Sequence, residues 1–503
     1  GSADDTVVVG DGAGDAITTG VDNTLIGDNA GTALTEGNDN VAIGNEALAA
    51  NTTGTGNTAI GTEALDANTT ANFNTAIGSG AATANTTGSE LVAVGRNALA
   101  ANTTGSSNTA VGMRALDVNT TGSYNTSIGA DTLGANTTGE YNTALGYRAL
   151  EDNTTGVRNT GVGRLSIGNN TTGNYNVGVG YSSLAVNTTA SNNTALGYST
   201  LATNTTGSTN VAVGAEALLD NSTGAENTAI GYRALYNNTT ASANTALGNA
   251  SQFYTTTGAN NTSIGQGSMY INSTGNTNVA VGNASLGLNT TGTNNVAVGV
   301  GAGYANTTGS ENTYIGDDAG DTTTTGGSNT LVGAHVLTSS AGSSNANGFG
   351  YNLTCADNYT TIGQGTADIR AEHGVATWAT VSDERVKKDI EDSTVGLAFI
   401  NDLRPVTFNY RNKGDLPKKF KAYEEGSTEV YKNSKTQHGF IAQEVKAAID
   451  KHSDIKDGFG MWDDDDPTGQ QRVGETAVIP MLVKAIQELS AQVEELKAQI
   501  NEE

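Results

Sequence analysis

A serine and a lysine near residue 385 form a pair whose types and spacing could do covalent chemistry. Ser382 and Lys387 lie five residues apart, so a single turn of chain could bring their side chains together. A serine hydroxyl becomes a nucleophile when a base accepts its proton, and a lysine can be that base once desolvation lowers its pKa. The alternative is a helix N-cap, because Ser-Asp followed by charged residues commonly opens a helix. These residues alone favour the N-cap.

The composition of the chain changes at the same place. Residues 1–381 carry 7 Arg, no Lys and 27 acidic residues, a net charge of 7 − 27 = −20, and are dominated by Gly, Asn, Thr and Ala. Residues 382–503 carry 17 basic and 24 acidic residues, a net charge of 17 − 24 = −7, and are richer in helix formers. This break predicts a domain boundary directly before Ser382.

The charge and the residue counts exclude several classes of protein. The net charge of 24 − 51 = −27 argues against nucleic acid or an anionic membrane as a partner. Cys355 is the single cysteine, which excludes an intrachain disulfide and a Cys-based zinc site. The four histidines show no metal-ligand spacing, and no stretch approaches the ~20 apolar residues that cross a bilayer. We therefore expect no metal, no cofactor and no membrane insertion. The Gly1-Ser2 start resembles a tag remnant, so we expect an anchoring region upstream of it.

The first part of the chain is a repeat. Glycine recurs every 17 residues from Gly10 to Gly333, and Gly350 continues this spacing. Around it the pattern is Asn-Thr-Ala-Ile-Gly-x-x-Ala-Leu-x-x-Asn-Thr-Thr-Gly-x-x, which is too short for two helices and a turn. β-Branched residues before the glycine and Asn-Thr-Thr-Gly turns favour short strands. The sequence therefore predicts a mainly β protein with a parallel β-solenoid shaft over residues 1–350. Its coils would stack ~4.8 Å apart, with ladders of asparagine amides.

The apolar residues of each coil indicate that the shaft associates. A coil offers about four modest apolar side chains, such as Ala59, Ile60, Ala64 and Leu65. One solenoid so thin would leave Ile or Leu exposed, and packing three solenoids side by side would cover that second stripe. The Asn-Thr-Ala-Ile-Gly-x-x-Ala-Leu signature resembles the head repeats of trimeric autotransporter adhesins, whose coils are somewhat shorter. That resemblance implies a trimeric parallel β-roll and says nothing about a ligand.

Three stretches of the second part resemble a known family. They are Trp378–Ile390 (WATVSDERVKKDI), Leu403–Tyr410 (LRPVTFNY) and His438–Glu444 (HGFIAQE). In this order they resemble the endosialidase-type C-terminal intramolecular chaperone of bacteriophage tail fibres and tailspikes, over roughly residues 378–500. The resemblance implies a domain that trimerises, templates the folding of the fibre before it and then cuts itself off. It implies cleavage between Val381 and Ser382, with Ser382 as nucleophile and Lys387 as its partner.

The accompanying motifs reverse the preference for a simple N-cap at Ser382. The candidate supporting residues of the self-cleavage site are Asp383, Arg385, His438, Gln443 and Glu444. Asp383 and Arg385 could cap and orient the turn between nucleophile and base. We expect residues 351–381 to connect the shaft to a small α+β chaperone domain at 382–503. Self-cleavage is the sole enzymatic activity that we expect. The 17-residue repeat runs from residue 10 to residue 333 without an inserted loop that could build a catalytic cleft.

The end of the chain predicts a coiled-coil helix over about 478–501. Its apolar residues alternate by three and four, as an a/d heptad seam requires: Ile479, Leu482, Ile486, Leu489, Val493, Leu496 and Ile500. Ile or Val at a with Leu at d usually favours a dimer, which disagrees with the expected homotrimer. The rival interpretation is a helix that packs on the core of its own domain.

Tyrosines recur at two places in the coil. Tyr147, Tyr181, Tyr198 and Tyr232 directly follow the repeated glycine, and Tyr124, Tyr141 and Tyr175 precede it by five residues. Aromatic faces with polar tips suit glycan stacking, so the first four are candidates for receptor binding. The alternative is packing of ring against ring between neighbouring coils.

Together these patterns predict a phage tail fibre or similar virion appendage, extracellular, that reaches a receptor on the host surface. The first alternative is a bacterial trimeric surface adhesin, located at the cell surface and built on the same shaft. The second is an ice-binding solenoid, because threonine columns ~4.8 Å apart could order water. Adjacent threonines such as Thr69 and Thr70 would point to opposite faces of a strand, however, so no flat threonine face is expected.

Overall fold

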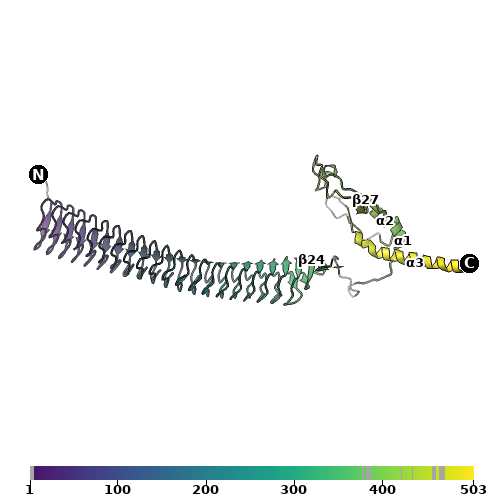
Figure 1. Cartoon of the computed structure of the whole chain (residues 1–503), viewed down its shortest axis with the longest axis horizontal. Helices are drawn as coiled ribbons and strands as arrows, with labels where there is room; N and C mark the ends of the chain where they lie inside the picture. Colours follow the sequence, from purple (N-terminus) through teal and green to yellow (C-terminus); the bar gives the residue numbers. More distant parts are fainter. Residues whose placement is uncertain are drawn as a thin grey trace. The chain divides into compact units, whose positions relative to one another are not determined.

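The computed structural model describes residues 5–375, 379–380, 384, 387–420, 422–432, 434–455, 460–463 and 471–502. The chain divides into two compact units, Gly1–Val381 and Ser382–Glu503. The first unit, drawn from purple to green in Figure 1, is a parallel β-solenoid of about 21 turns, each made by one 17-residue coil. The prediction of a mainly β fold with 17-residue coils is therefore confirmed.

Each coil of the shaft contributes one three-residue strand to a single parallel sheet. Residues 17 apart pair in register, so that Ala59 of β4 lies beside Ala76 of β5. The strands are β1 Val7–Val9, β2 Thr24–Ile26, β3 Val41–Ile43, β4 Thr58–Ile60, β5 Thr75–Ile77, β6 Val92–Val94, β7 Thr109–Val111, β8 Thr126–Ile128, β9 Thr143–Leu145, β10 Thr160–Val162, β11 Val177–Val179, β12 Thr194–Leu196, β13 Val211–Val213, β14 Thr228–Ile230, β15 Thr245–Leu247, β16 Thr262–Ile264, β17 Val279–Val281, β18 Val296–Val298, β19 Thr313–Ile315 and β20 Thr330–Val332.

The core of the shaft is built from small and medium side chains. From β2 to β20 the middle strand residue is buried, and in the coil of β4 Ala59, Ala64 and Leu65 are fully buried. Leu65 has a φ of 51°, a left-handed conformation that costs a residue with a side chain roughly 1–2 kcal/mol. Burial of a leucine side chain contributes about 1.5–3 kcal/mol, so burial outweighs the strain of the turn.

The third residue of each strand points the other way. This residue is Ile, Val or Leu in every coil from Val9 to Val332, and it is exposed or half-exposed throughout. We call this column the aliphatic stripe. Ile77 and Leu145, for example, keep 39% and 45% of their surface exposed. The expectation that a single thin solenoid leaves its Ile and Leu side chains uncovered agrees with these exposures.

The repeated glycine lets the backbones of neighbouring coils approach closely. Gly231 has a φ of 135°, a region that residues with a side chain rarely adopt. A Cβ built there would lie 2.5 Å from the carbonyl oxygen of Gly248 in the next coil. The same short approach recurs along the column, for example from Gly44 to Gly61. Any side chain at this place would separate the coils, which explains why the lattice requires glycine.

Two columns of buried asparagine join the coils from inside. In the first column Asn142 donates its backbone N–H to Asn125 Oδ1 at 3.0 Å and its Nδ2 to the same oxygen at 3.2 Å. In the second column Asn68 Nδ2 donates to Asn51 Oδ1 at 3.0 Å and to the Ala71 carbonyl at 3.2 Å. These contacts satisfy polar groups that burial would otherwise leave unpaired. The predicted amide ladders are therefore present.

The second asparagine column is interrupted at Thr255 and at Thr323. Thr255 stands where the second asparagine column has Asn, and among the described residues the buried Asn238 Oδ1 and Thr255 Oγ1 have no hydrogen-bond partner. The apolar core is interrupted at the same level, because one cluster ends at Ala246 and the next begins at Met269. Fully buried polar side chains fill the gap: Ser251, Gln252, Ser263 and Ser268.

The β-sheet of the first unit ends before residue 381. The strands that follow β20 are β21 Leu337–Thr338, β22 Asn347–Tyr351, β23 Thr354–Cys355, β24 Tyr359–Gln364, β25 Ala367–Glu372 and β26 Ala379–Thr380. β22 and β24 continue the parallel stack, whereas β25 pairs antiparallel with β24 and β26 pairs antiparallel with β25. The turned-back strands cover the edge that the last parallel strand would leave open. Cys355 lies buried here, and burial raises the pKa of its thiol to about 11.

The second unit is smaller and mixes helices with short strands (Figure 1). Its elements are α1 Leu397–Asp402, β27 Val406–Phe408, η2 Lys413–Asp415, β28 Gln437–Gly439, α2 Ala442–Asp450, β29 Trp462–Asp463, β30 Arg472–Val473, η3 Glu475–Val478 and α3 Ile479–Glu502. Phe399 of α1 and Val445 and Ile449 of α2 are buried together in its core. α3 lies against α1, where the Leu397 backbone N–H donates to Glu488 Oε2 at 2.7 Å.

The predicted seam of α3 stays exposed. Ile486 keeps 66% of its surface exposed and Ile500 keeps 72%, and the other five seam residues are exposed as well. The helix rests on its own unit through a different face, which includes the buried Ala485. One face of α3 therefore packs on its own unit, as the rival interpretation expected, whereas the heptad seam does not.

Replacing Thr255 by Asn should stabilise the shaft. The new amide would donate to Asn238 Oδ1, and its own oxygen would accept from Asn272, restoring two ladder bonds. Each such hydrogen bond contributes about 0.5–1.5 kcal/mol. We expect the Thr255→Asn variant to unfold at a higher temperature or urea concentration, measured by circular dichroism. Thr257→Asn is the matched control, because Thr257 is exposed; an equal gain from both variants would contradict the ladder explanation.

Candidate functional site

Two of the three C-terminal motifs meet in the second unit. The motif of residues 403–410 supplies β27, and the motif of residues 438–444 supplies the end of β28 and the start of α2. The two strands pair antiparallel, with Thr407 opposite His438. Phe440, which follows β28, packs against the core that contains Phe399 and Val445. The motifs therefore share one local structure, although about 30 residues of sequence separate them.

An ion pair ties the same two motifs together. Arg404 Nε donates to Glu444 Oε2 at 2.9 Å, and Arg404 Nη2 donates to Glu444 Oε1. This two-pronged arrangement fixes the direction of both side chains. It also hydrogen-bonds the ionised carboxylate, which holds the pKa of Glu444 below its ordinary value. Glu444, predicted as a supporting residue of the cleavage site, thus joins the start of α2 to the residue that leads into β27.

The other predicted residues of the last motif line the surface. His438 is exposed on β28 and borders a hollow that Glu475 also lines. The Glu475 carboxylate lies over Gly439, because a Cβ built at 439 would be 2.7 Å from Glu475 Oε1. Gln443 is exposed on α2 and borders a second hollow beside Tyr410. Both side chains are accessible, and their roles in cleavage stay predictions.

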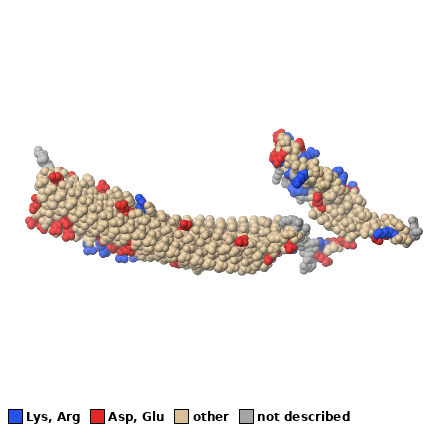
Figure 2. Space-filling view, in the orientation of Figure 1, with Lys and Arg blue, Asp and Glu red and all other residues tan. Residues whose placement is uncertain are grey.

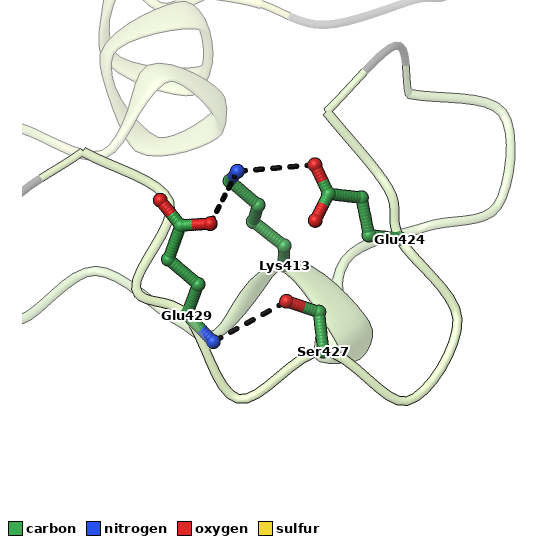
Figure 3. Close-up of polar contacts among 4 residues, drawn as sticks. All are labelled: Lys413, Glu424, Ser427 and Glu429. Atoms are coloured by element: carbon green, nitrogen blue, oxygen red, sulfur yellow. Dashed lines mark hydrogen bonds and ion pairs between the residues drawn. The ribbon is translucent and has the colours of Figure 1, made fainter.

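A long connection between β27 and β28 is held by ion pairs around Lys413 (Figure 3). Lys413 Nζ lies 2.7 Å from Glu429 Oε2 and 3.0 Å from Glu424 Oε1. Hydrogen bonds to Glu429 first, and then to Glu424, raise the pKa of Lys413. The Glu429 backbone N–H donates to Ser427 Oγ at 3.3 Å, which closes the turn. A lysine that two carboxylates hold in its charged form is a poor base, so Lys413 is a structural residue.

The first motif carries the predicted nucleophile and base. Lys387 is exposed, and its backbone N–H donates to the Glu384 carbonyl at 3.0 Å, as in a turn. The residues of this motif that lie outside the described ones are Trp378, Val381, Ser382, Asp383, Arg385 and Val386. The Ser382–Lys387 dyad therefore stays a prediction.

The four receptor-binding candidates are exposed on the shaft. Tyr147, Tyr181, Tyr198 and Tyr232 each keep between 42% and 54% of their surface exposed. The rings of Tyr181 and Tyr198 stack with centroids 5.5 Å apart. Packing of ring against ring, the alternative to glycan stacking, therefore occurs for this pair.

The sequence interpretation missed the arginines between the tyrosines. Arg164 lies between Tyr147 and Tyr181, with its guanidinium 5.9 Å and 5.4 Å from the two ring centroids. It also missed a third aromatic column, in which Tyr236, Phe253 and Tyr270 stack 5.0 Å and 5.3 Å apart. Both could have been found by aligning the coils and reading every column, instead of following one residue type.

One of the threonine columns joins neighbouring coils by hydrogen bonds. Thr52 Oγ1 donates to the Thr69 carbonyl at 3.1 Å, and Thr69 Oγ1 donates to the Thr86 carbonyl at 3.2 Å. These hydroxyls connect coils and are committed to protein acceptors. Thr69 and Thr70 lie in a bend, so the picture of two faces of one strand was wrong for them. The adjacent column, which includes Thr53, Thr70 and Thr87, is exposed, so the ice-binding alternative stays untested.

One group of described side chains has metal-ligand types close together. Single ligand atoms of Asp317, Asp318 and His335 lie within 4.8 Å of one another. His335 Nε2 is 3.9 Å from Asp317 Oδ2, and Nδ1 is 3.8 Å from Asp318 Oδ2. All three side chains are about half exposed, and groups of exposed acidic side chains are common without a metal ion. Among the described helices, none has the length and apolarity to cross a bilayer.

The Arg404–Glu444 pair should make the second unit sensitive to acid. Because the folded-state pKa of Glu444 is lowered, the pair stabilises the fold above the unfolded-state pKa, and that contribution is lost as the pH falls through the folded-state pKa. We expect Glu444→Gln to lower the urea midpoint at pH 7 and to match the wild type once both are acidified below that pKa. Tryptophan fluorescence measures the transition. Glu495→Gln, the same charge change on exposed α3, should have little effect at either pH.

Comparison with known proteins gives one informative result for the second unit. No curated protein matches the chain. A family model does match, and the match begins at the predicted nucleophile and extends through both β27 and α2. Its range includes Ser382, Lys387, His438, Gln443 and Glu444. Residues 382–454 match the family described as the chaperone of endosialidase, in agreement with the resemblance that the three motifs indicated.

Proposed function

We propose that the chain is a phage tail fibre, or a comparable virion appendage, that attaches to a receptor on the bacterial surface. The observation that carries the proposal is the start of the family match at Ser382, the first residue of the second unit, directly after the repetitive shaft. Near-identical coils can slip by a whole repeat at little local cost, so a rod of this kind needs a nucleus that sets its register. A chaperone domain at the end of the shaft supplies that nucleus.

The nucleus is a homotrimer in this proposal. Two long apolar surfaces of the described residues support association: the aliphatic stripe of the shaft and the seam of α3. Continuous exposed apolar surface marks protein–protein interfaces, because monomers seldom leave so much of it in water. Three chains that bury both surfaces would start at α3 and then stack their coils together. The family's trimeric assembly agrees with this arrangement.

Self-cleavage would release the nucleus after folding. Ser382 Oγ attacks the carbonyl carbon of Val381 while Lys387 accepts the hydroxyl proton. The peptide C–N bond breaks, the amine of Ser382 takes a proton from the lysine, and an ester joins Val381 to Ser382 Oγ. Water hydrolyses the ester and restores the hydroxyl, which leaves a carboxylate at Val381 and a free amine at Ser382.

The exposure of Lys387 couples this chemistry to assembly. A lysine becomes an effective base when it is desolvated, and Lys387 is exposed in the single chain. Packing of three chains around the dyad would remove water from it. Cleavage would then follow assembly and would not precede it, which keeps the chaperone attached for as long as it is needed.

A bacterial trimeric surface adhesin is the second candidate. It is supported by the coil signature, which resembles adhesin head repeats, and by the same exposed stripe. The two candidates differ in what holds the N-terminal end of the shaft, a virion or a cell envelope. Immunogold labelling of virions and of bacterial cells with an antibody against the shaft distinguishes them.

The cleavage proposal predicts two fragments. Wild-type protein should yield one fragment that ends at Val381 and another that begins at Ser382, both identified by intact mass spectrometry. Ser382→Ala should abolish the cut because it removes the nucleophile, and Lys387→Ala should slow it severely. Ser393→Ala is the control and should cut normally. A single species of about 50.9 kDa in wild-type protein after long incubation would tell against self-cleavage.

The assembly proposal predicts that the α3 seam controls both trimer formation and cleavage. The double variant Ile486→Asp, Leu489→Asp places charge in the seam, and both side chains are exposed in the single chain, so its own fold should survive. We expect light scattering to show loss of the trimer and mass spectrometry to show loss of cleavage. Gln487→Asp, exposed beside the seam, should keep both. A trimeric, cleaved double variant would refute the role of the seam.

A further inference from the structure

Two columns of large side chains flank the strands in the middle of the shaft. We name them by their position relative to the strand. The upstream ladder consists of Tyr124, Tyr141, Arg158 and Tyr175, and the downstream ladder consists of Tyr147, Arg164, Tyr181 and Tyr198. The two arginines stand at the two ends of one strand, β10 (Thr160–Val162), and tyrosines occupy both ends of the strands before and after it.

Each arginine is held between two aromatic rings. In the upstream ladder the Arg158 guanidinium lies 5.4 Å from the centroid of Tyr141 and 5.5 Å from that of Tyr175. In the downstream ladder the distances from Arg164 to Tyr147 and Tyr181 are 5.9 Å and 5.4 Å. Further rings extend the stacks, because Tyr124 lies 5.0 Å from Tyr141 in a parallel orientation. These contacts restrict the guanidinium groups before any ligand arrives.

Each guanidinium has more N–H donors than its tyrosine partner uses. A guanidinium carries five N–H donors, which all lie in its plane. Arg158 Nη1 donates to the Tyr175 hydroxyl at 2.7 Å, and Arg164 Nη1 donates to the Tyr181 hydroxyl at 3.0 Å. Each tyrosine hydroxyl that accepts in this way keeps its own proton to donate. Both arginines and both tyrosines are exposed, so a guanidinium and a hydroxyl lie together on the surface near each end of β10.

Three of the seven arginines in residues 1–381 pair with a described carboxylate, and Arg158 and Arg164 are not among them. Arg114, Arg148 and Arg233 each pair with a carboxylate, at 2.7, 3.2 and 2.6 Å. Among the residues that the structure describes, neither Arg158 nor Arg164 has a carboxylate within ion-pairing distance. The shaft contains 27 acidic residues in 1–381, so the lack of a partner is not due to a shortage of acids. Figure 2 shows red acidic atoms scattered along the shaft, with blue basic atoms gathered in its N-terminal half.

We propose that the two Tyr–Arg ladders bind carboxylate groups of an acidic glycan. This inference rests on the proposed role in surface attachment and names the class of receptor. A guanidinium edge matches a carboxylate in a charge-assisted, two-pronged contact, and the neighbouring hydroxyl suits a sugar oxygen. The tyrosines above and below each arginine repeat every ~4.8 Å, a step similar to the length of one sugar ring.

Assembly of the shaft does not account for the ladders. The aliphatic stripe runs through every coil from Val9 to Val332, whereas the ladders occupy only the coils between residues 124 and 198. A feature needed for the association of identical coils would be expected along the whole stack. The ladders are an addition at one level of the shaft, which is what a localised binding site requires.

The test measures binding of a defined glycan to the full-length protein by calorimetry. Oligogalacturonate is the probe, and its methyl ester, which has the same backbone without free carboxylates, is the ligand control. The test variant is Arg158→Gln, Arg164→Gln. The matched control is Arg114→Gln, Arg233→Gln, which changes the net charge equally but removes arginines that already have acidic partners.

We expect the wild type to bind oligogalacturonate and not its methyl ester. The test variant should bind about tenfold or more weakly, because a hydrogen bond to a charged group contributes about 1.5–3 kcal/mol. The control variant should stay within about twofold of the wild type. Binding of the ester, no binding of either ligand, or an equal loss in both variants would overturn the proposal.

Two further measurements separate this proposal from the function on which it rests. A change of oligomeric state in the test variant, seen by light scattering, would assign the ladders to assembly and overturn the glycan site. If the wild type and the test variant adhere to bacterial cells equally well, the proposed glycan site is wrong. The proposed role of the protein in attachment is then unaffected. Loss of adhesion in the test variant alone supports the ladders as the receptor site.

Discussion

The close approach of coil to coil at the repeated glycine is the constraint on which the rest of the shaft depends. With no Cβ at Gly231 and its equivalents, each backbone can lie against the next, and every other column is brought into register. The asparagine ladders, the paired strands and the stacked rings all require that register. The departures near Thr255 are tolerated because the glycine column and the strand pairing continue through them, from β15 to β17. Side chains can change while the backbone contact is preserved.

Much of this architecture could be predicted from the sequence because the lattice repeats a local rule. The 17-residue step predicted the solenoid, the buried Asn columns predicted the ladders, and the heptad spacing predicted α3. The unpredicted features depend on contacts between positions that no local pattern relates. Arg404 and Glu444 are 40 residues apart, and their pairing follows from the way β27 and α2 pack. The sandwich around Arg158 needs neighbours in two other coils, which a search along the chain does not bring together.

Each unit leaves an apolar surface exposed to solvent, and the two surfaces differ in form. In the shaft it is an aliphatic column on the strands, and in the second unit it is a helical seam that ends near Ile500. Each unit also has a satisfied core of its own, around Leu65 in one and Phe399 in the other. Folding of a coil or a helix and association of chains can therefore be separate steps. Such a division suits a protein whose chaperone is required for assembly and not for the internal packing of each coil.

The constant coil has a consequence for length. Because each coil of 17 residues adds one step of ~4.8 Å, the reach of the shaft can change only in whole steps. Deletion of the residues from one glycine to the next, such as 61–77, would join equivalent ends and leave every column continuous. The length of the shaft is therefore set by the number of coils. Duplication or loss of a repeat in the gene would lengthen or shorten it without requiring any new contact.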